Sequence, residues 1–229
     1  MTNRMLSLFL VALALGCSTT GPIRNHQGGT EAGRFSFAWQ SRPVQRVTPA
    51  DHANILNLLE SENPMLALYR EDVTHQAVMD FFVNLTGSPE TALPMMYHAE
   101  RADISFSLVF SLAWVESRFS PVAVNRNASS VDRGLFQLNS LTFRNLTDED
   151  FFHVDVNTYH GIDYLTWCLA HTKDEYQAVA VYNAGLTRVR AGRTPASTLV
   201  YVERIRQYRT QLEERFQKYI LSEFPSYNA

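Results

Sequence analysis

Cysteine, long apolar runs and an excess of either charge are all scarce in this 229-residue chain. Two cysteines, Cys17 and Cys168, are too few for a disulfide framework or a zinc cluster, and the seven histidines show no metal-ligand spacing. We therefore expect no metal and no cofactor. The 20 basic and 23 acidic residues nearly balance, without a basic run, which argues against a nucleic-acid partner. No apolar run approaches the roughly 20 residues of a transmembrane helix.

The composition is that of a folded protein. Apolar residues make up 45% of the chain and charged residues 19%, which excludes a disordered or collagen-like protein and supplies enough side chains for a core. At about 150 residues per domain, the length allows one domain or a small pair of domains.

The N-terminal segment has the pattern of a targeting signal. A short positive region with Arg4 precedes an apolar run from Met5 to Leu15, and Gly16 then precedes Cys17. This order is typical of a secretory signal peptide, and a small residue directly before Cys resembles the lipobox of bacterial lipoproteins. We expect residues 1–16 to be removed and Cys17 to be lipidated, which would make this a periplasmic lipoprotein of the inner or outer membrane. The alternatives are an ordinary signal peptide or a buried apolar N-terminus.

The rest of the chain predicts an all-α fold without strand-like alternation. Residues 17–47 are polar and favour a flexible tether. Residues 48–102 contain amphipathic helices, which extend the core or bind a partner such as a cell-wall machinery protein. Thr48-Pro49-Ala50-Asp51 predicts a helix start, Gly87 a helix end, and Ser88-Pro89 the start of another turn. Residues 103–221 form the predicted main helical domain, including a helix that opens with a capping box at Thr172 and ends at Gly185.

One carboxylate follows an unusually apolar segment. Eleven uncharged residues precede Glu116, and on a helix this side chain lies above Leu112 and Ala113 on the face that points to the core. Loss of water disfavours the charged form of a carboxylate, and a proton held near neutral pH is what a general acid needs. The alternative is that Glu116 ends a helix and reaches solvent or pairs with Arg118.

Polar and aromatic side chains gather in two later segments. Residues 125–134 are polar and turn-rich, and residues 135–139 set amides among apolar anchors. Tyr182 and Asn183 lie near the end of an expected helix. Amides, hydroxyls and aromatic rings suit neutral sugars that carry acetamido groups.

Five ordered motifs between Phe106 and Tyr208 carry a family resemblance. They are Glu116-Ser-Arg-Phe119, Gly134-Leu-Phe-Gln137, Asp155-Val-Asn157 with Gly161 and Tyr164-Leu165, Tyr182-Asn-Ala-Gly185, and Thr198-Leu-Val-Tyr201-Val202. Together they resemble the catalytic domain of lytic transglycosylases of the soluble-lytic-transglycosylase type, which are related to goose-type lysozyme. The sequence departs from the family where Phe136 replaces Met, where a Pro after Asp155 is absent, and where Ser197 replaces Glu.

The resemblance implies a lysozyme-like helical domain with a substrate cleft and peptidoglycan as substrate. Glu116 would protonate the oxygen between N-acetylmuramic acid and N-acetylglucosamine, while the substrate's own acetamido group steadies the cationic sugar. The ionised Glu116 would then take the proton of the C6 hydroxyl, which closes onto C1 and leaves a 1,6-anhydromuramic end. One carboxylate suffices, because no water is consumed.

The resemblance also implies roles for neighbouring side chains. Gln137 would bind the sugar or its acetamido group, and Tyr182 would lie close to Glu116 and orient that group. Asn183 would hold its loop or touch the glycan. Ser117 would polarise Glu116 or contact the leaving sugar, or else serve only as a helix-terminal hydroxyl.

Two aromatic residues of the motifs receive separate expectations. Phe136 offers a flat ring in place of a flexible Met, and we expect it to stack on a sugar face. Tyr201 is expected to be structural.

A second carboxylate would change the reaction. Asp132 precedes the Gly134 motif, and a position opposite Glu116 with room for water would support a hydrolysing muramidase. We expect residues 148–150 to form a solvated loop and Asp155 to cap a helix. A third alternative, from a different class, is a lipoprotein that binds peptidoglycan without cleaving it.

Arginines are concentrated late in the chain. They stand at positions 188, 190, 193, 204, 206 and 209. They form either a solvated helix face or a contact for an acidic polymer or lipid head groups.

Overall fold

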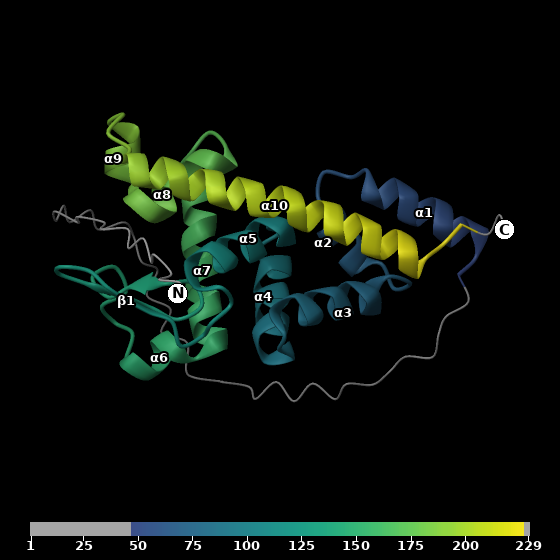
Figure 1. The fold of residues 1–229 in the computed structure, drawn as a ribbon, viewed down its shortest axis with the longest axis horizontal. Coiled ribbons are helices and arrows are strands. Elements are labelled where there is room, and N and C mark those ends of the chain that lie inside the picture. Colours follow the sequence, from purple (N-terminus) through teal and green to yellow (C-terminus); the bar gives the residue numbers. More distant parts are fainter. Residues whose placement is uncertain (1–46, 227–229) are drawn as a thin grey trace, which may run out of the picture.

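The computed structural model describes residues 47–226, which are mostly helical with one small sheet (Figure 1). The helices are α1 (Pro49–Leu59), α2 (Pro64–Arg70), α3 (His75–Thr86), α4 (Pro89–Arg101), α5 (Phe106–Ser117), α6 (Asp148–Phe152), α7 (Val154–Ala170), α8 (Glu175–Ala184), α9 (Leu186–Arg190) and α10 (Ala196–Glu223). The strands are β1 (Val124–Arg126), β2 (Val131–Arg133) and β3 (Leu138–Asn139). This content confirms the predicted fold class. The signal peptide, Cys17 and nearly all of the tether lie outside the described residues.

The helices between residues 47 and 226 include none that is both long and apolar enough to cross a membrane. The domain boundary expected between residues 102 and 103 stays a prediction.

The small sheet corrects the expectation that the chain forms no strands. Its order is β1-β2-β3, and both pairs are antiparallel. The register places Asn125 and Asn139 on either side of Asp132. Polar side chains at these central positions replace the apolar alternation by which strands are usually recognised, so the sequence pattern did not reveal them.

Several helix boundaries follow the predicted signals. Thr48 caps α1 in a capping box with Asp51, and Pro49 occupies the first helical position. Ser88 caps α4 in a similar way by accepting the N–H of Thr91, and Gly87 ends α3 with a φ of 73°. These caps fix where the N-terminal helices begin and end.

Three local predictions were wrong. The helix α8 begins after Asp174 rather than after Thr172, because the Asp174 carboxylate accepts the first-turn N–H. Asp155 does not cap α7 but pairs with His98 of α4 at 2.8 Å. Residues 148–150 form the start of α6 instead of a loop, since the preceding Thr supplies a capping box.

The hydrophobic core is shared between the N-terminal helices and the later ones. The ring centroid of Phe82 in α3 lies 4.2 Å from that of Phe110 in α5 and 6.2 Å from that of Phe216 in α10. Ile55 of α1 belongs to the same buried cluster. The apolar side chains of residues 48–102 therefore pack in the core of the molecule.

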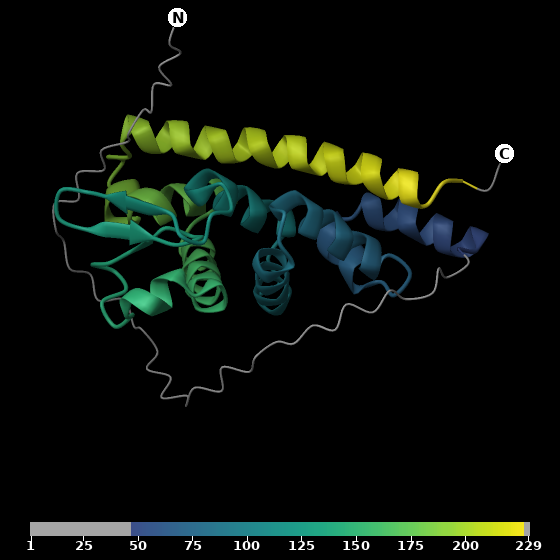
Figure 2. The same cartoon turned by 60° about the horizontal axis from the view of Figure 1, so that its bottom comes forward.

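The long helix α10 connects the parts of the fold (Figure 2). It packs along α5 and contacts α8 and α3. The first helix, α1, begins at the end of the molecule where α10 ends, whereas the sheet lies at the opposite end (Figure 1).

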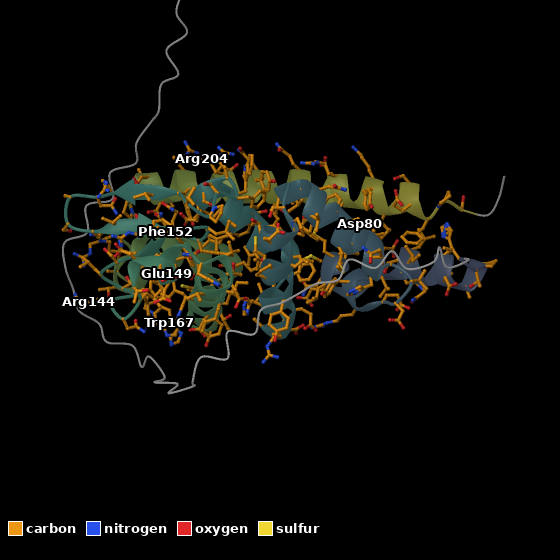
Figure 3. All side chains as sticks on the ribbon, turned by 90° about the horizontal axis from the view of Figure 1, so that it is seen from below. Asp80, Arg144, Glu149, Phe152, Trp167 and Arg204 are labelled. Carbon is orange, nitrogen blue, oxygen red and sulfur yellow. The ribbon has the colours of Figure 1, made fainter. Side chains whose placement is uncertain are left out.

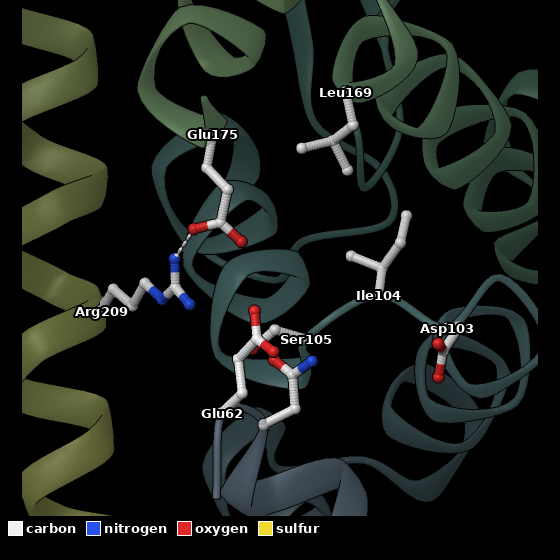
Figure 4. Close-up of a pocket in the computed structure, with 8 residues that line it drawn as sticks. Glu62, Asp103, Ile104, Ser105, Leu169, Glu175 and Arg209 are labelled. Atoms are coloured by element: carbon white, nitrogen blue, oxygen red, sulfur yellow. Dashed lines mark hydrogen bonds and ion pairs between the residues drawn. The ribbon is translucent and has the colours of Figure 1, made fainter. Parts of the chain in front are cut away.

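A pocket of about 240 Å³ lies where the N-terminal helices meet α8 and α10 (Figure 4). Arg209 of α10 donates to Glu175 at the start of α8 across its wall, and this ion pair ties the two helices together. The pocket is lined by Glu62, Asn63, Asp103, Ile104, Ser105, Leu169, Glu175 and Arg209. Glu116 does not line this pocket. We therefore regard the pocket as a gap in the packing of the helices and not as part of the candidate active site.

Candidate active site

The helix α5 carries Glu116 in its last turn. Val109, Leu112 and Ala113 are fully buried below it, because α5 is apolar on nearly every face and runs through the core. Glu116 itself keeps part of its surface accessible to solvent. The carboxyl group therefore lies at the boundary between the core and the outside, where a substrate can reach it.

The backbone near Glu116 adopts a conformation that side chains other than glycine rarely take. Arg118 and Phe119 have φ angles of 57° and 62°, and Gln137 has a φ of 47°. Such left-handed residues cost free energy and persist where the surrounding structure holds them. The first two turn the chain from α5 toward the sheet, and the third shapes the loop before β3. Three of the four such residues in the described chain thus flank the predicted site.

The electrostatics of Glu116 match those of a general acid. The pKa of Glu116 is raised from 4.5 to about 8, chiefly by burial and further by the negative charge of Asp132, while a hydrogen bond from the Tyr201 hydroxyl to Oε1 acts in the opposite direction. Arg118 does not neutralise Glu116, because its guanidinium lies over the Trp114 ring, 4.3 Å from the centroid. The carboxyl group consequently keeps its proton at neutral pH.

Asp132 is held in place by three asparagine amides. Its Oδ2 accepts from Asn127 at 2.8 Å and Asn125 at 3.2 Å, and its Oδ1 accepts from Asn139 at 2.6 Å. The antiparallel register explains this arrangement, since Asp132 lies between Asn125 and Asn139 on the central strand. Three N–H donors suit a carboxylate anion, which can only accept. The site thus contains a protonated carboxyl group and a negative charge near it.

Gln137 uses its amide nitrogen to hold the loop. Nε2 donates to the carbonyl oxygens of Gly134 at 2.9 Å and Ala123 at 3.1 Å. No hydrogen bond reaches its Oε1 from the described residues, so this oxygen is the part of the side chain that remains for a ligand. Its predicted contact with the sugar stays a prediction.

The position of Phe136 corrects the expectation that its ring stacks on a sugar. The residue is fully buried, and its backbone N–H donates to Asn157 Oδ1 at 2.8 Å. Its ring packs against Gly161 of α7, where an added Cβ would lie 2.4 Å from the ring carbon Cγ. Because Gly161 has no side chain, the Phe136 ring occupies the space beside it. Phe136 is therefore a core residue.

Tyr182 and Asn183 lie at the end of α8 and bind the protein itself. The Tyr182 hydroxyl donates to the Phe136 carbonyl oxygen at 3.0 Å. Burial raises the pKa of Tyr182 well above its ordinary value, and the negative charge that Glu116 carries when ionised raises it further. Asn183 Oδ1 accepts from Thr198 Oγ1 at 2.7 Å and so joins α8 to the start of α10.

Ser117 shows the contact of a helix-terminal hydroxyl. Its Oγ donates to the carbonyl oxygen of Ala113, one turn earlier, at 3.2 Å, and the residue is buried. Its proposed contact with Glu116 or a leaving sugar stays a prediction.

Tyr201 is the site residue that sequence reasoning missed. It was expected to be structural, yet its hydroxyl reaches the carboxyl group of Glu116, 85 positions earlier in the chain. Burial and the adjacent Glu116 raise the pKa of Tyr201 well above its ordinary value, so it remains a donor. The only sequence signal was the resemblance of residues 198–202 to the last family motif, which gives no distance to the acid.

The described residues contain no group of three or more His, Cys, Asp or Glu side chains arranged to hold a metal ion. Cys17 lies outside these residues, so the structure does not place its side chain.

The comparison with known proteins finds one family model that spans most of this site. The family model described as Transglycosylase SLT domain matches residues 94–198. The matched range contains Glu116, Asp132, Gln137 and Tyr182, and Tyr201 follows three positions after it. No curated protein matches the chain significantly. Over residues 94–198 the chain is therefore similar to transglycosylase SLT domains, which is consistent with a lysozyme-like lytic transglycosylase domain.

Proposed function

We propose that the protein is a lytic transglycosylase that cleaves the bond between N-acetylmuramic acid and N-acetylglucosamine and leaves 1,6-anhydromuramic ends. One observation carries the proposal, namely Glu116 at the end of an apolar helix with its pKa raised to about 8 and with Tyr201 as hydrogen-bond donor. An acid of this strength holds its proton at neutral pH and can still release it.

The first step uses the proton of Glu116. It passes to the oxygen between the two sugars, the bond from that oxygen to C1 breaks, and the leaving sugar departs with a new hydroxyl. The muramic sugar then carries positive charge at C1, which its own acetamido oxygen steadies. Glu116 becomes an anion in a site of low polarity, where the Tyr201 hydroxyl stabilises the new charge by donating to Oε1.

The second step restores Glu116. The carboxylate accepts the proton of the C6 hydroxyl, the C6 oxygen bonds to C1, and the anhydro ring closes. Protons and bonds balance without water, and the same carboxyl group acts first as acid and then as base. Tyr182, near the end of α8, is expected to position the acetamido group.

The experiment is digestion of purified peptidoglycan with mass analysis of the products. Wild-type protein should release fragments one water lighter than reducing-end fragments. Glu116→Gln should lower turnover by about 10²–10⁴-fold while the protein still binds glycan, because Gln keeps the shape but carries no proton to give. Undiminished cleavage by this variant would falsify the assignment, and binding without cleavage by the wild-type protein would favour the non-catalytic alternative.

A second candidate function is a muramidase that uses water, and the arrangement of Asp132 favours it. Three asparagine amides donate to this carboxylate, and its charge contributes to the raised pKa of Glu116. Two carboxyl groups in opposite protonation states are what hydrolysis of a glycosidic bond requires. In this reaction Asp132 would activate water or stabilise the positive sugar.

Product masses separate the two candidates. Reducing ends in place of anhydro ends would show hydrolysis by the wild-type protein. Asp132→Asn should abolish hydrolysis but leave anhydro formation largely intact, and Glu149→Gln, an exposed acid of α6, serves as the charge-matched control.

We also propose that the chain is exported and lipidated at Cys17, which would hold the catalytic domain on the periplasmic side of a membrane. The support is the signal-like order of residues 1–17. Intact mass and membrane fractionation test it, since Cys17→Ala should lose the lipid mass and move to the soluble fraction. Fractionation of the two membranes then tells which of them holds the protein. Any partner in the cell-wall machinery stays a prediction.

A further inference from the structure

The two flanks of α10 differ in how their basic side chains are balanced. On one flank, Arg206 forms a 2.7 Å ion pair with Glu203, and Arg209 pairs with Glu175 and with Glu213, the latter at 2.9 Å. These arginines belong to the late cluster seen in the sequence, and carboxylates within the fold neutralise them. This flank therefore offers little net charge to a partner.

The other flank carries basic residues that form no ion pair within the described part of the chain. Arg204, Arg215 and Lys218 recur at intervals of 11 and 3 residues, which places them on one face of the helix. We call these three residues the cationic stripe. All three are exposed, and none forms an ion pair within residues 47–226. Arg204 projects from α10 in Figure 3. Between Arg204 and Lys218 this face presents Gln207, Tyr208, Gln211 and Arg215, and the one acid at its edge is Glu214, four residues before Lys218.

One end of the cationic stripe adjoins the candidate active site. Arg204 lies one helical turn after Tyr201, whose hydroxyl binds Glu116. Tyr208, on the same face, stacks on Trp114 of α5 at 4.9 Å, and Arg118 covers that indole ring. Arg118 is also exposed and follows the catalytic acid by two positions. Positive charge thus continues from the acid onto α10.

The other end of the stripe reaches a groove that is partly apolar. The groove has a volume of about 360 Å³, and in it Arg215 and Lys218 stand beside Phe81 and Leu85 of α3 and beside Tyr219. Between Arg204 and Lys218 the helix rises about 20 Å, so the stripe extends well beyond a single sugar. Cationic side chains next to apolar ones suit a ligand that combines carboxylates with short aliphatic side chains.

Neutral sugars carry no negative charge with which the cationic stripe could form ion pairs. The carboxylates of peptidoglycan are carried by its short stem peptides, which are attached to the muramic sugars. A strand placed with its glycan at Glu116 presents these peptides beside the glycan, and α10 leads away from Glu116. The charge and the composition of the groove therefore both match a stem peptide.

We propose that the cationic stripe of α10 binds the carboxylates of peptidoglycan stem peptides, so that the protein prefers strands that carry these peptides over bare glycan. This inference rests on the proposed action on peptidoglycan and adds to it a site for the peptide part of the substrate. Exposed charge pairs are individually weak, and several of them acting together on one flexible ligand supply selectivity.

Binding of two kinds of glycan strand tests the proposal. One kind keeps its stem peptides, and the other has lost them through treatment with an amidase. The binding protein is the Glu116→Gln variant, so that cleavage does not interfere. In this background, Arg204→Gln, Arg215→Gln and Lys218→Gln together should weaken binding of peptide-bearing strands by about tenfold at low salt. Binding of bare strands should stay unchanged, and added salt should reduce the difference.

A control with the same loss of charge combines Arg101→Gln, Arg144→Gln and Arg206→Gln, three exposed arginines away from the stripe. It should bind peptide-bearing strands like the parent. Equal binding of peptide-bearing strands by the stripe variant and the parent overturns the proposal, and so does an equal loss on both kinds of strand. Anionic lipid vesicles serve as a further probe. If the stripe variant loses only vesicle binding, the stripe binds a membrane surface and the proposal is wrong.

Cleavage is measured separately with the native Glu116. The stripe variant should then show a raised KM on peptide-bearing strands with an unchanged kcat. If the native protein cleaves neither strand, the proposed function fails, while the binding comparison still decides whether the stripe recognises stem peptides.

Discussion

At the scale of single residues, Glu116 holds a proton that an exposed glutamic acid would lose. Its pKa in the folded protein is about 8 against an ordinary 4.5. Above pH 4.5 the unfolded chain releases this proton while the folded chain keeps it, so a rising pH favours unfolding until about pH 8. The residue that supports catalysis therefore lowers the stability of the fold.

Replacement of Glu116 by Gln should stabilise the protein in a pH-dependent way. At pH 8 we expect a gain of about 1–3 kcal/mol, reduced from the full effect of the pKa shift because the side chain is partly exposed. At pH 4 the variant and the wild type should unfold alike, since both states keep the proton. Thermal unfolding at pH 4, 6 and 8 measures the difference, with Glu214→Gln as exposed control. Equal stability at every pH would contradict a raised pKa.

Removal of the Tyr201 hydroxyl should change the acidity of Glu116. The hydrogen bond from Tyr201 lowers the pKa of Glu116, so Tyr201→Phe should move the alkaline limb of the kcat profile to higher pH. We also expect kcat to fall about tenfold, because the carboxylate formed during the reaction loses a donor. Tyr176→Phe, an exposed tyrosine of α8, is the control. A lower kcat with an unmoved pH limb would leave Tyr201 with a purely structural role.

Single residues also show what sequence reasoning can reach. Glu116 was predicted because eleven uncharged residues precede it, and such a pattern is visible within one helix. Tyr201 and Phe136 were misjudged because their roles depend on contacts across 85 and 25 positions of the chain. The family motif identified them as important residues without telling whether each lies in the site or in the core.

At the scale of elements, α7 holds the loop that carries Gln137. Asn157 of α7 is nearly fully buried, and its side chain makes three hydrogen bonds to backbone groups of that region. Nδ2 donates to the carbonyl oxygens of Phe151 at 2.8 Å and Arg133 at 3.1 Å, and Oδ1 accepts the N–H of Phe136. One side chain thus fastens the sheet and the loop to the helical body.

Asn157→Ala should destabilise the protein by about 3 kcal/mol or more, because it leaves three backbone groups without partners in a buried place. Activity should fall together with stability, since Gln137 and Asp132 lie in the segment that is released. Chemical denaturation measures the loss, and Asn145→Ala at an exposed position gives the reference. A loss below about 1 kcal/mol would show that the loop holds itself.

Helix boundaries were predictable where one cap decided them, as at Thr48 and Ser88. The sheet was not, because its strands are two or three residues long and are stabilised by the amides around Asp132 rather than by an apolar face. The short helix α6 was missed for a related reason, since its capping box lies in a run of acids that reads as a solvated loop. Short elements carry too few residues for a period to be recognised.

At the scale of the whole molecule, the N-terminal helices and the catalytic domain share one core. Phe81 and Phe82 of α3 pack against Phe216 of α10, and α10 in turn supplies Tyr201 to the site. We therefore expect residues 103–226 alone to lack cooperative unfolding, whereas residues 47–226 should unfold in one transition. Circular dichroism during heating compares the two fragments. A cooperative transition in the shorter fragment would show that residues 47–102 form a separate unit.

The two ends of α10 have different surroundings. This difference fixes how far the catalytic residues lie from the start of the described fold. Tyr201, with the acid it serves, lies near the start of the helix, whereas α1 begins near the far end of α10 (Figure 1). From Tyr201 to Glu223 the axis rises about 30 Å. If the chain is anchored upstream of Val47, the length of α10 separates the catalytic residues from the end of the fold that the tether joins, and this length adds to the distance at which they can reach wall material.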